Sequence, residues 1–251
     1  MRISDSLIRF LKNGKNADKY YNRILSKEDE ILYANRFHDV VKGSSWFPET
    51  FSVCPGVGSA GYNLLYCLFR ILDEAKPKHI LELGMGQTTK MIGQYSLHHK
   101  TDDFYHIVVE HDEGFIDFCR RWYPLDAARI CHMELMEEEY PAGGKTKTYR
   151  YRNFSDNLKK DRFDLIVVDG PYGYNRPEYS RVDILDILPD CLEQEFCLVF
   201  DDCNRIGEQN TLKKVRSILE ESGIVFFETR INGETEVCLI TSEKNRFLTY
   251  T

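Results

Sequence analysis

Several features are missing from this sequence of 251 residues, and each absence excludes a class of protein. No apolar run approaches membrane-spanning length, and the first residues are not followed by the apolar core of a signal peptide. Positive charge is not in excess, since the formal net charge is -7. A broad electrostatic surface for nucleic acid is therefore not expected. We expect a cytoplasmic protein with no membrane span and no nucleic-acid partner.

Cysteine pairs of the C-x-x-C type are also missing, although the chain has 8 cysteines. Several of them stand within apolar, strand-like runs, as Cys197 and Cys238 do. This spacing favours reduced thiols in the core over disulfide bonds or a zinc site. No catalytic role is expected for the cysteines.

The chain divides into a polar N-terminal part and a longer α/β part. Residues 46–251 alternate between strand-like and helix-like patterns, which predicts one α/β domain. Residues 1–45 predict a helical N-terminal extension that packs on this domain, with a lid or a homodimer surface as alternative roles. The short helices expected in this extension cover residues 3–11, 20–25 and 26–41.

Residues 79–92 indicate a buried parallel strand, a glycine turn and a helix. Gly84 and Gly86 allow the backbone to turn tightly and to approach a ligand closely. Gln87 and Thr88 open the helix, and the N-terminus of a helix favours polar or negatively charged ligand groups. We therefore expect these four residues to contact a cofactor.

The next predicted strand covers residues 105–109 and is followed by Glu110 and His111. A carboxylate at the end of this strand suits a ribose, because two neighbouring hydroxyl groups are held best by a bidentate acceptor. We expect Glu110 to bind the ribose of a cofactor, with His111 beside it. The loop at 46–61 adds Ser59 as a further candidate cofactor contact.

Two later strands deliver three carboxylates to one edge of the sheet. The apolar run 165–168 leads to Asp169, and the run 196–200 leads to Asp201 and Asp202. Because neighbouring parallel strands end at the same edge, these side chains should converge. Oxygen ligands of this kind suit Mg²⁺ or another hard divalent cation. The sequence therefore predicts a cation site here.

The C-terminal part carries a strong hairpin signal. Residues 224–231 and 234–241 flank Asn232-Gly233, which favours a two-residue turn between antiparallel strands. Together with the five parallel strands that precede it, the hairpin predicts a seven-stranded, mostly parallel sheet that ends in an antiparallel pair.

The segment Glu82-Leu83-Gly84-Met85-Gly86 resembles the first motif of class I S-adenosylmethionine-dependent methyltransferases. With the other strand ends, the resemblance covers roughly residues 55–245. It implies a Rossmann-like fold and S-adenosyl-L-methionine as the cofactor. It also implies that Glu82 lies near the methionine amino group and that Asp169 lies beside the cofactor.

Three further segments narrow the resemblance. They are Asp169-Gly170-Pro171, Tyr179-Ser180-Arg181 and Asp201-Asp202-Cys203-Asn204-Arg205. These segments are similar to those of bacterial capsule and surface-polysaccharide methyltransferases, of macrocin-type sugar O-methyltransferases and, distantly, of glucuronoxylan 4-O-methyltransferases. The resemblance implies methyl transfer to a hydroxyl of a sugar or another small molecule in polysaccharide biosynthesis, with a divalent cation on the three aspartates.

The proton acceptor is not settled by the resemblance. Catechol-type O-methyltransferases, which share the aspartates, carry a lysine where this chain has Tyr172. The base therefore stays open between Asp169 and Tyr172. Arginine suits carboxylate or phosphate groups, so an acidic or nucleotide-linked sugar is the expected acceptor. The candidate substrate residues are Tyr174, Arg176, Arg181 and Arg205.

Other functions stay open at this point. An NAD(P)-dependent oxidoreductase would want a third glycine at position 89, where this chain has Thr89. A non-catalytic, methyltransferase-like scaffold protein would keep the fold without the chemistry. An enzyme of the same type could also act on a phenol or an amine.

Overall fold

The computed structural model describes residues 14–54 and 60–250. The helix expected at 3–11 and the candidate contact Ser59 lie outside these residues. Within the described ranges, no helix combines the length and the apolar character that crossing a membrane requires.

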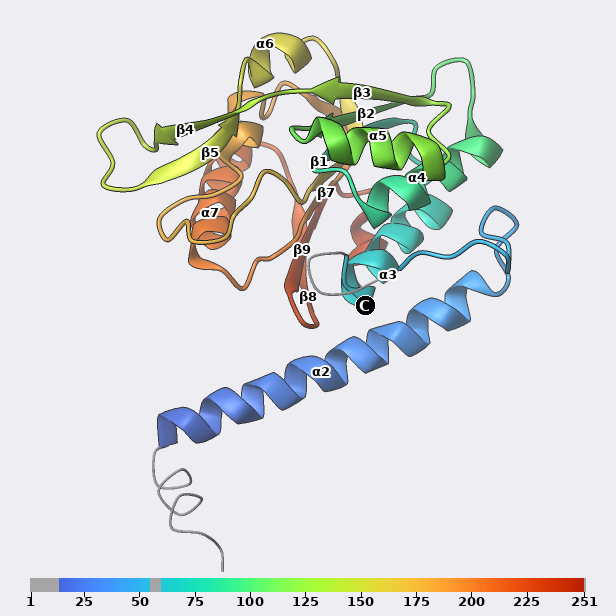
Figure 1. The fold of residues 1–251 in the computed structure, drawn as a ribbon, viewed down its shortest axis with the longest axis horizontal. Coiled ribbons are helices and arrows are strands. Elements are labelled where there is room, and N and C mark those ends of the chain that lie inside the picture. Colours follow the sequence, from blue (N-terminus) through green and yellow to red (C-terminus); the bar gives the residue numbers. More distant parts are fainter. Residues whose placement is uncertain (1–13, 55–59, 251) are drawn as a thin grey trace, which may run out of the picture.

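A seven-stranded sheet forms the centre of the fold (Figure 1). Its strand order is β3-β2-β1-β6-β7-β9-β8. The first five strands pair in parallel, and β9 pairs antiparallel with both β7 and β8. The prediction of a mostly parallel sheet with a C-terminal hairpin is confirmed, and this is the Rossmann-like fold of class I methyltransferases. The strands are β1 (His79–Leu83), β2 (Tyr105–Glu110), β3 (Ala128–His132), β6 (Phe163–Val168), β7 (Leu192–Phe200), β8 (Phe227–Asn232) and β9 (Glu236–Thr241).

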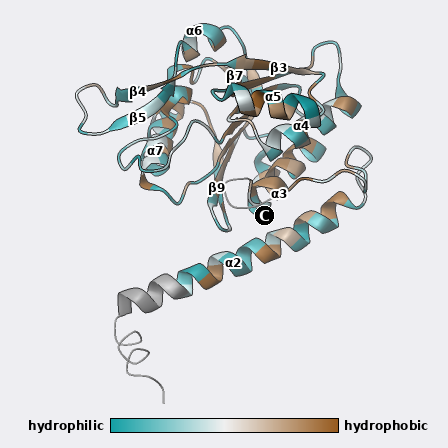
Figure 2. Ribbon diagram, in the orientation of Figure 1, coloured by the Kyte–Doolittle hydropathy of each residue, from teal (hydrophilic) through white to brown (hydrophobic). Residues whose placement is uncertain are grey.

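Helices cover both faces of the sheet, because its central strands are apolar on both sides (Figure 2). Leu165 and Val167 of β6 belong to the core beneath α3 and α4, whereas Ile166 and Val168 belong to the core beneath α7. The helical elements are α2 (Gly14–Val41), α3 (Tyr62–Arg70), η1 (Ile71–Ala75), α4 (Gln87–His99), α5 (Glu113–Trp122), α6 (Phe154–Leu158), η2 (Val182–Asp186), α7 (Ile206–Glu221) and η3 (Arg246–Thr249).

A small second sheet projects from the domain (Figure 1). It consists of β4 (Leu135–Glu139) and β5 (Lys147–Tyr151), which pair antiparallel. This hairpin lies in the connection between β3 and β6. Its strand β5 brings Tyr151 to the wall of the cavity described below.

The N-terminal extension differs from the sequence prediction in one respect. The two helices expected at 20–25 and 26–41 form one continuous helix, α2. The hydroxyl of Ser26 donates to the carbonyl of Arg23 at 3.1 Å within that helix, so it does not cap a new one. After Gly14 the helix contains neither glycine nor proline to interrupt it.

Helix α2 packs on the α/β domain along its C-terminal half. Tyr33 and Phe37 are buried in the same core as α3. Phe37 also meets Phe47 and Phe69 edge to face, with ring centroids 5.8 Å and 6.2 Å away. The N-terminal half of the helix runs out beyond β8 and β9 (Figure 1).

Candidate active site

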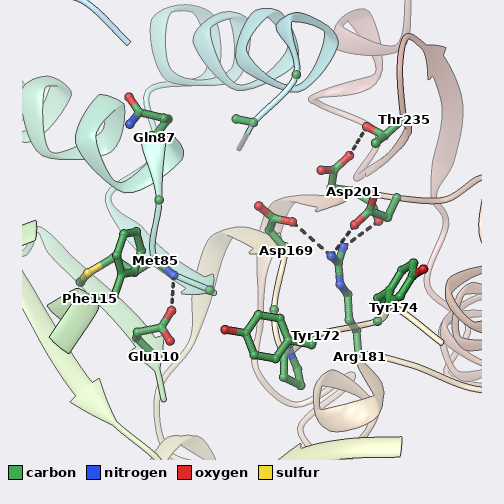
Figure 3. A pocket seen from close by; sticks show the side chains of 18 of the residues that line it. Met85, Gln87, Glu110, Phe115, Asp169, Tyr172, Tyr174, Arg181, Asp201 and Thr235 are labelled. Carbon is green, nitrogen blue, oxygen red and sulfur yellow. Dashed lines mark hydrogen bonds and ion pairs between the residues drawn. The ribbon is translucent and has the colours of Figure 1, made fainter. Parts of the chain in front are cut away.

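A cavity of about 1010 Å³ opens at the carboxyl ends of the parallel strands. Loops that follow β1, β2, β6 and β7 line it, together with the turn of the β8–β9 hairpin. This is the edge at which open α/β sheets bind their ligands. Figure 3 shows Met85, Glu110 and Phe115 on one side of the cavity, and Asp169, Arg181 and Asp201 on the other.

The glycine turn after β1 has two different functions in the structure. Gly84 has φ +91°, and a Cβ there would lie 2.9 Å from the backbone nitrogen of Gly170. Gly170 meets Gly84 just as closely from the other side. Gly86 differs, because a Cβ there would meet nothing within 4 Å. The first glycine therefore allows two loops to pack, whereas the second leaves space beside the cavity.

Glu110 is buried on the side of the cavity where the sequence predicts a cofactor, which we call the cofactor side. Its Oε2 accepts from the Met85 N–H at 2.9 Å, and its Oε1 accepts from the N–H groups of His111 and Asp112 at 2.7 Å and 2.9 Å. The ring atom Nδ1 of His111 lies 2.7 Å from Oε1 as well. Burial alone would raise the pKa of Glu110, but these hydrogen bonds outweigh burial and hold the pKa below its usual range. An ionised carboxylate is therefore fixed beside the glycine turn.

The cofactor side also has an apolar and aromatic wall, which was not predicted from the sequence. It is made by Met85 and by Phe115, Phe118 and Tyr123 in and after α5. Gln87 lines the cavity too, where its amide donates to the Tyr123 hydroxyl at 3.0 Å and accepts from the Cys54 N–H at 2.9 Å. Phe115 and Phe118 lie three residues apart on one face of α5, and this spacing is a signal for the wall that the sequence contains.

Two of the predicted cofactor residues lie behind the turn. Glu82 is fully buried, accepts a hydrogen bond from the Thr88 hydroxyl, and lies 3.0 Å from His106 Nε2. Neither Glu82 nor Thr88 is among the residues that line the cavity. Thr89 rather than Thr88 holds the helix start, since its hydroxyl accepts from the Gly86 N–H at 2.8 Å. Glu82 and Thr88 therefore stabilise the glycine turn from within the core.

The three predicted aspartates converge as expected. Asp169, Asp201 and Asp202 each present an oxygen within 4.8 Å of the others. Their exposure differs, because the Asp169 side chain is 30% exposed and that of Asp202 only 9%. Burial and then the charge of Asp201 raise the pKa of Asp169 to about 8. Burial and the charge of Asp202 raise the pKa of Asp201 in the same way.

Arg181, a predicted substrate residue, lies inside this cluster. Its Nη2 donates to Asp169 Oδ1 at 3.2 Å and to Asp202 Oδ2 at 2.6 Å (Figure 3). Burial alone would lower the pKa of Arg181, but the charges of Asp169, Asp202 and Asp201 outweigh burial and raise it. Arg181 is therefore a buried, permanently charged partner of the aspartates.

The other predicted substrate residues fall into two groups. Tyr174 and Arg205 line the cavity, and Arg205 Nη2 lies 2.8 Å from Asp202 Oδ1. Arg176 is outside the cavity lining, where it donates to Glu137 at 2.7 Å and stacks on the Tyr149 ring at 3.9 Å. Arg176 therefore stabilises the β4–β5 hairpin by contacting both of its strands.

Tyr172 lines the cavity between its two sides (Figure 3). Its ring meets the His111 ring edge to face, with centroids 4.7 Å apart. Burial, followed by the charges of Glu110 and Asp112, raises the pKa of Tyr172 above its ordinary value. A tyrosine with a raised pKa is a poor proton acceptor, so this position favours a role as a wall of the cavity.

The far end of the cavity is lined by the N-terminal helix, for which a lid was one alternative role, and by the C-terminal hairpin, for which no role at the site was predicted. Glu30 of α2 accepts from the N–H groups of Tyr62 at 2.5 Å and of Glu234 at 3.2 Å. The hydroxyl of Thr235 donates to Asp201 Oδ1 at 2.8 Å. Glu30, Glu234 and Thr235 all line the cavity. Glu234 and Thr235 follow the predicted Asn232-Gly233 turn directly, but the hairpin pattern did not place them at the site, and no motif pointed to Glu30.

Three solved methyltransferases align with most of this chain at low sequence identity, with TM-scores of 0.49 or less. No family model matches the sequence, and no curated protein matches it significantly. The O-methyltransferase TomG from Streptomyces achromogenes, in complex with SAM, is 12% identical over 90% of this chain and 95% of that chain, with a TM-score of 0.48. The SAH-bound methyltransferase PaMTH1 from Podospora anserina is 16% identical over 92% and 97%, with a TM-score of 0.49. The O-methyltransferase from Bacillus cereus in complex with SAH is 13% identical over 90% and 97%, with a TM-score of 0.48.

Proposed function

We propose that this protein is an S-adenosylmethionine-dependent O-methyltransferase that acts on a hydroxyl of a sugar or another small molecule. The observation that carries the proposal is that one cavity joins a fixed, ionised Glu110 to Asp169, which is the most exposed of the three aspartates. A nucleoside site and a proton acceptor thus face the same space.

The cofactor side fits a nucleoside that carries a charged sulfur. Glu110 keeps part of the acceptor capacity of Oε2 for ribose hydroxyl groups, since that oxygen accepts only the Met85 N–H within the described part of the chain. Phe115, Phe118 and Met85 offer an apolar surface to a base. The open space at Gly86 allows a ligand to approach the backbone closely.

Asp169 is the residue best placed to accept the proton of the acceptor. S-adenosylmethionine supplies an activated methyl group on a positively charged sulfur. In the proposed transfer this methyl group would pass to the acceptor oxygen, with S-adenosylhomocysteine as the leaving group, and Asp169 would accept the hydroxyl proton on a carboxylate oxygen. Oδ2 is the available atom, because Oδ1 is held by Arg181. A base with a pKa near neutrality is effective in such a transfer.

The acceptor is proposed to be a neutral sugar hydroxyl, as in the biosynthesis of a surface polysaccharide. The sequence pointed to an acidic sugar because of the arginines, but Arg181 is engaged with aspartates and Arg176 lies outside the cavity. The far end of the cavity carries the carboxylates of Glu30 and Glu234. Negative charge there disfavours a uronate or a phosphate.

The divalent cation predicted on the three aspartates fits only in part. The oxygens are close enough to share an ion, but both oxygens of Asp202 face arginines, at 2.6 Å and 2.8 Å. The proposed reaction therefore does not depend on a cation.

We further propose that the protein forms a homodimer through the outer face of α2. The apolar residues on this face are exposed, and the pair Ile24 and Leu25 recurs seven residues later as Ile31 and Leu32. We call this face, made by Tyr21, Ile24, Leu25, Ile31 and Leu32, the outer stripe of α2.

A methyl-transfer assay with labelled S-adenosylmethionine tests the proposed function. The acceptors would be matched pairs of neutral sugars, uronates and phosphorylated sugars, with a catechol and a primary amine for comparison. The proposal expects transfer to a neutral sugar hydroxyl. Transfer to the amine or to the uronates alone would contradict the acceptor class, and hydride transfer from NADH would contradict the reaction.

A further inference from the structure

We infer that Arg181 takes the place of a divalent cation in this active site, so that methyl transfer proceeds without a metal ion. The inference rests on the proposed function and names the group that neutralises and orients Asp169. It assigns Arg181 a positioning role, in place of the substrate contact that its sequence suggested.

The guanidinium of Arg181 is anchored by both strands that carry the aspartates. Its Nη1 donates to the carbonyl of Val168 at 3.3 Å and to the carbonyl of Asp201 at 2.8 Å. Val168 ends β6, and Asp201 follows β7 directly. Its Nη2 binds the side chains of Asp169 and Asp202. Four contacts from the two terminal nitrogens therefore hold one rigid fork at the junction of two strand ends.

Arg181 is also shielded from solvent, whereas an arginine that binds a substrate has to be accessible. Its side chain is 4% exposed, compared with 36% for Arg205. Its third nitrogen, Nε, lies 4.0 Å from the buried carboxylate of Glu208. A side chain that is enclosed in this way cannot turn toward an acceptor without leaving several buried acidic groups unpaired, which is costly.

Most side-chain oxygens of the three aspartates already take part in a hydrogen bond or an ion pair. Asp202 faces Arg181 with Oδ2 and Arg205 with Oδ1. Asp201 Oδ1 accepts from Thr235, and Asp169 Oδ1 accepts from Arg181. Within the described residues this leaves Asp169 Oδ2 and Asp201 Oδ2 as the oxygens of the trio that no other side chain is seen to bind. A hard cation such as Mg²⁺ prefers about six oxygen ligands and would have to displace the guanidinium to gather a third carboxylate.

The chemical consequence concerns Asp169. A guanidinium binds one oxygen of this carboxylate and leaves the other directed to the acceptor, so the base is both oriented and partly neutralised. A metal ion would instead draw the acceptor oxygen onto itself. The arrangement with arginine therefore predicts activity that depends on the carboxylate and not on added cations.

The first test uses the full-length wild-type protein and Mn²⁺ as the probe. Electron paramagnetic resonance measures free Mn²⁺ as it is titrated into the protein, with Asp169→Asn as the control for binding at this site. The inference expects equal, weak binding to both proteins, and methyl transfer that is unchanged after EDTA treatment. Wild-type binding in the micromolar range that Asp169→Asn abolishes, or activity that EDTA removes and Mn²⁺ restores, would overturn it.

The second test removes the guanidinium. Arg181→Ala should have a lower Tm than the wild type, and Mn²⁺ should raise this Tm in a saturable way because Asp169 Oδ1 and Asp202 Oδ2 are then released from the guanidinium. Arg176→Ala is the matched control, since it removes an arginine outside the cavity, and its Tm should not respond to Mn²⁺. An Arg181→Ala protein that folds and ignores Mn²⁺ counts against the inference.

If Arg181→Ala does not fold, Arg181→Lys replaces it. Lysine keeps a charge but cannot fork to two carboxylates, so Asp202 should become available and the protein should gain Mn²⁺ binding relative to the wild type. An unchanged affinity would contradict the inference. These metal-binding results need neither S-adenosylmethionine nor an acceptor, so they stand even if the proposed methyl transfer is not observed.

Discussion

Gly84 and Gly170 face each other across the loops that follow β1 and β6, so closely that a Cβ on Gly84 would lie 2.9 Å from the Gly170 nitrogen. The contact joins the glycine turn after β1, where a cofactor is proposed to bind, to the loop that begins at Asp169. Glycine is required at this point by the positive φ of Gly84 as well as by the contact.

Substitutions at the two glycines of the turn should therefore have different effects. Gly84→Ala is expected to lower the free energy of unfolding by about 1–3 kcal/mol, because it adds backbone strain and a clash with Gly170. Gly86→Ala should leave this free energy nearly unchanged, since its Cβ meets open space, but it should weaken S-adenosylmethionine binding. Urea unfolding and calorimetric titration of both variants check the prediction. Equal loss of stability in the two variants would show that the turn is packed differently.

Asp169→Asn should separate chemistry from binding. The amide keeps the size of the side chain but is not a base, so kcat for methyl transfer should fall by about 100-fold or more. The Kd for S-adenosylmethionine should change little, because the cofactor is expected to be held mainly by the Glu110 side. Tyr172→Phe is the comparison, since Tyr172 is the other candidate base. A larger loss of kcat in Tyr172→Phe than in Asp169→Asn would transfer the role of base to the tyrosine.

Much of this site could be predicted from the sequence, because the ends of parallel strands must meet at one edge. Asp169, Asp201 and Asp202 were brought together by that rule alone, and the hairpin after Gly223 followed from Asn232-Gly233. The partner of the aspartates could not be found in this way. Arg181 stands twelve residues beyond Asp169, at the start of η2, and only the folded loop turns its side chain back into the cluster.

The same limit applies to the roles of other predicted residues. Arg176 and Arg181 look alike in sequence, yet one stacks on Tyr149 outside the cavity and the other is enclosed by aspartates. Glu30 lies in the N-terminal helix and reaches the cavity only because α2 packs across the domain. Such long-range contacts depend on packing, which no local pattern encodes.

The buried Asp183 gives the stability of the protein a pH dependence. Its Oδ1 accepts from the Tyr151 N–H at 2.9 Å, and burial raises its pKa to about 7. Because the folded protein favours the protonated acid, the contribution of Asp183 to stability is greatest below its ordinary pKa of 3.8 and is lost as the pH rises through about 7.

Asp183→Asn should remove this effect. Between pH 4 and 7 the free energy of unfolding of the variant should fall less steeply than that of the wild type, by up to about 1.4 kcal/mol per pH unit. Asp190→Asn, an exposed aspartate shortly after the same short helix, should keep the wild-type slope. Urea unfolding at several pH values measures the slopes. Parallel curves for Asp183→Asn and the wild type would contradict the raised pKa.

The outer stripe of α2 can be tested independently of the active site. Ile24→Glu combined with Leu32→Glu places charges in the proposed dimer contact, and the dimer should dissociate to a monomer of 29.4 kDa. Light scattering after size-exclusion chromatography measures the mass. Asp39→Asn, on the same helix but beyond the outer stripe, is the control and should leave the measured mass unchanged. A wild-type protein that is already monomeric at high concentration would contradict the homodimer.

The central claim is that the cavity binds S-adenosylmethionine through Glu110, and calorimetric titration tests it most directly. The wild type should bind S-adenosylmethionine with a micromolar Kd and should not bind NADH. Glu110→Gln should lose about tenfold or more in affinity, since a neutral amide cannot serve all the donors that the carboxylate accepts. Glu113→Gln, an exposed neighbour on α5, should bind as the wild type does. Absence of binding to the wild type, or equal binding by wild type and Glu110→Gln, would contradict the account.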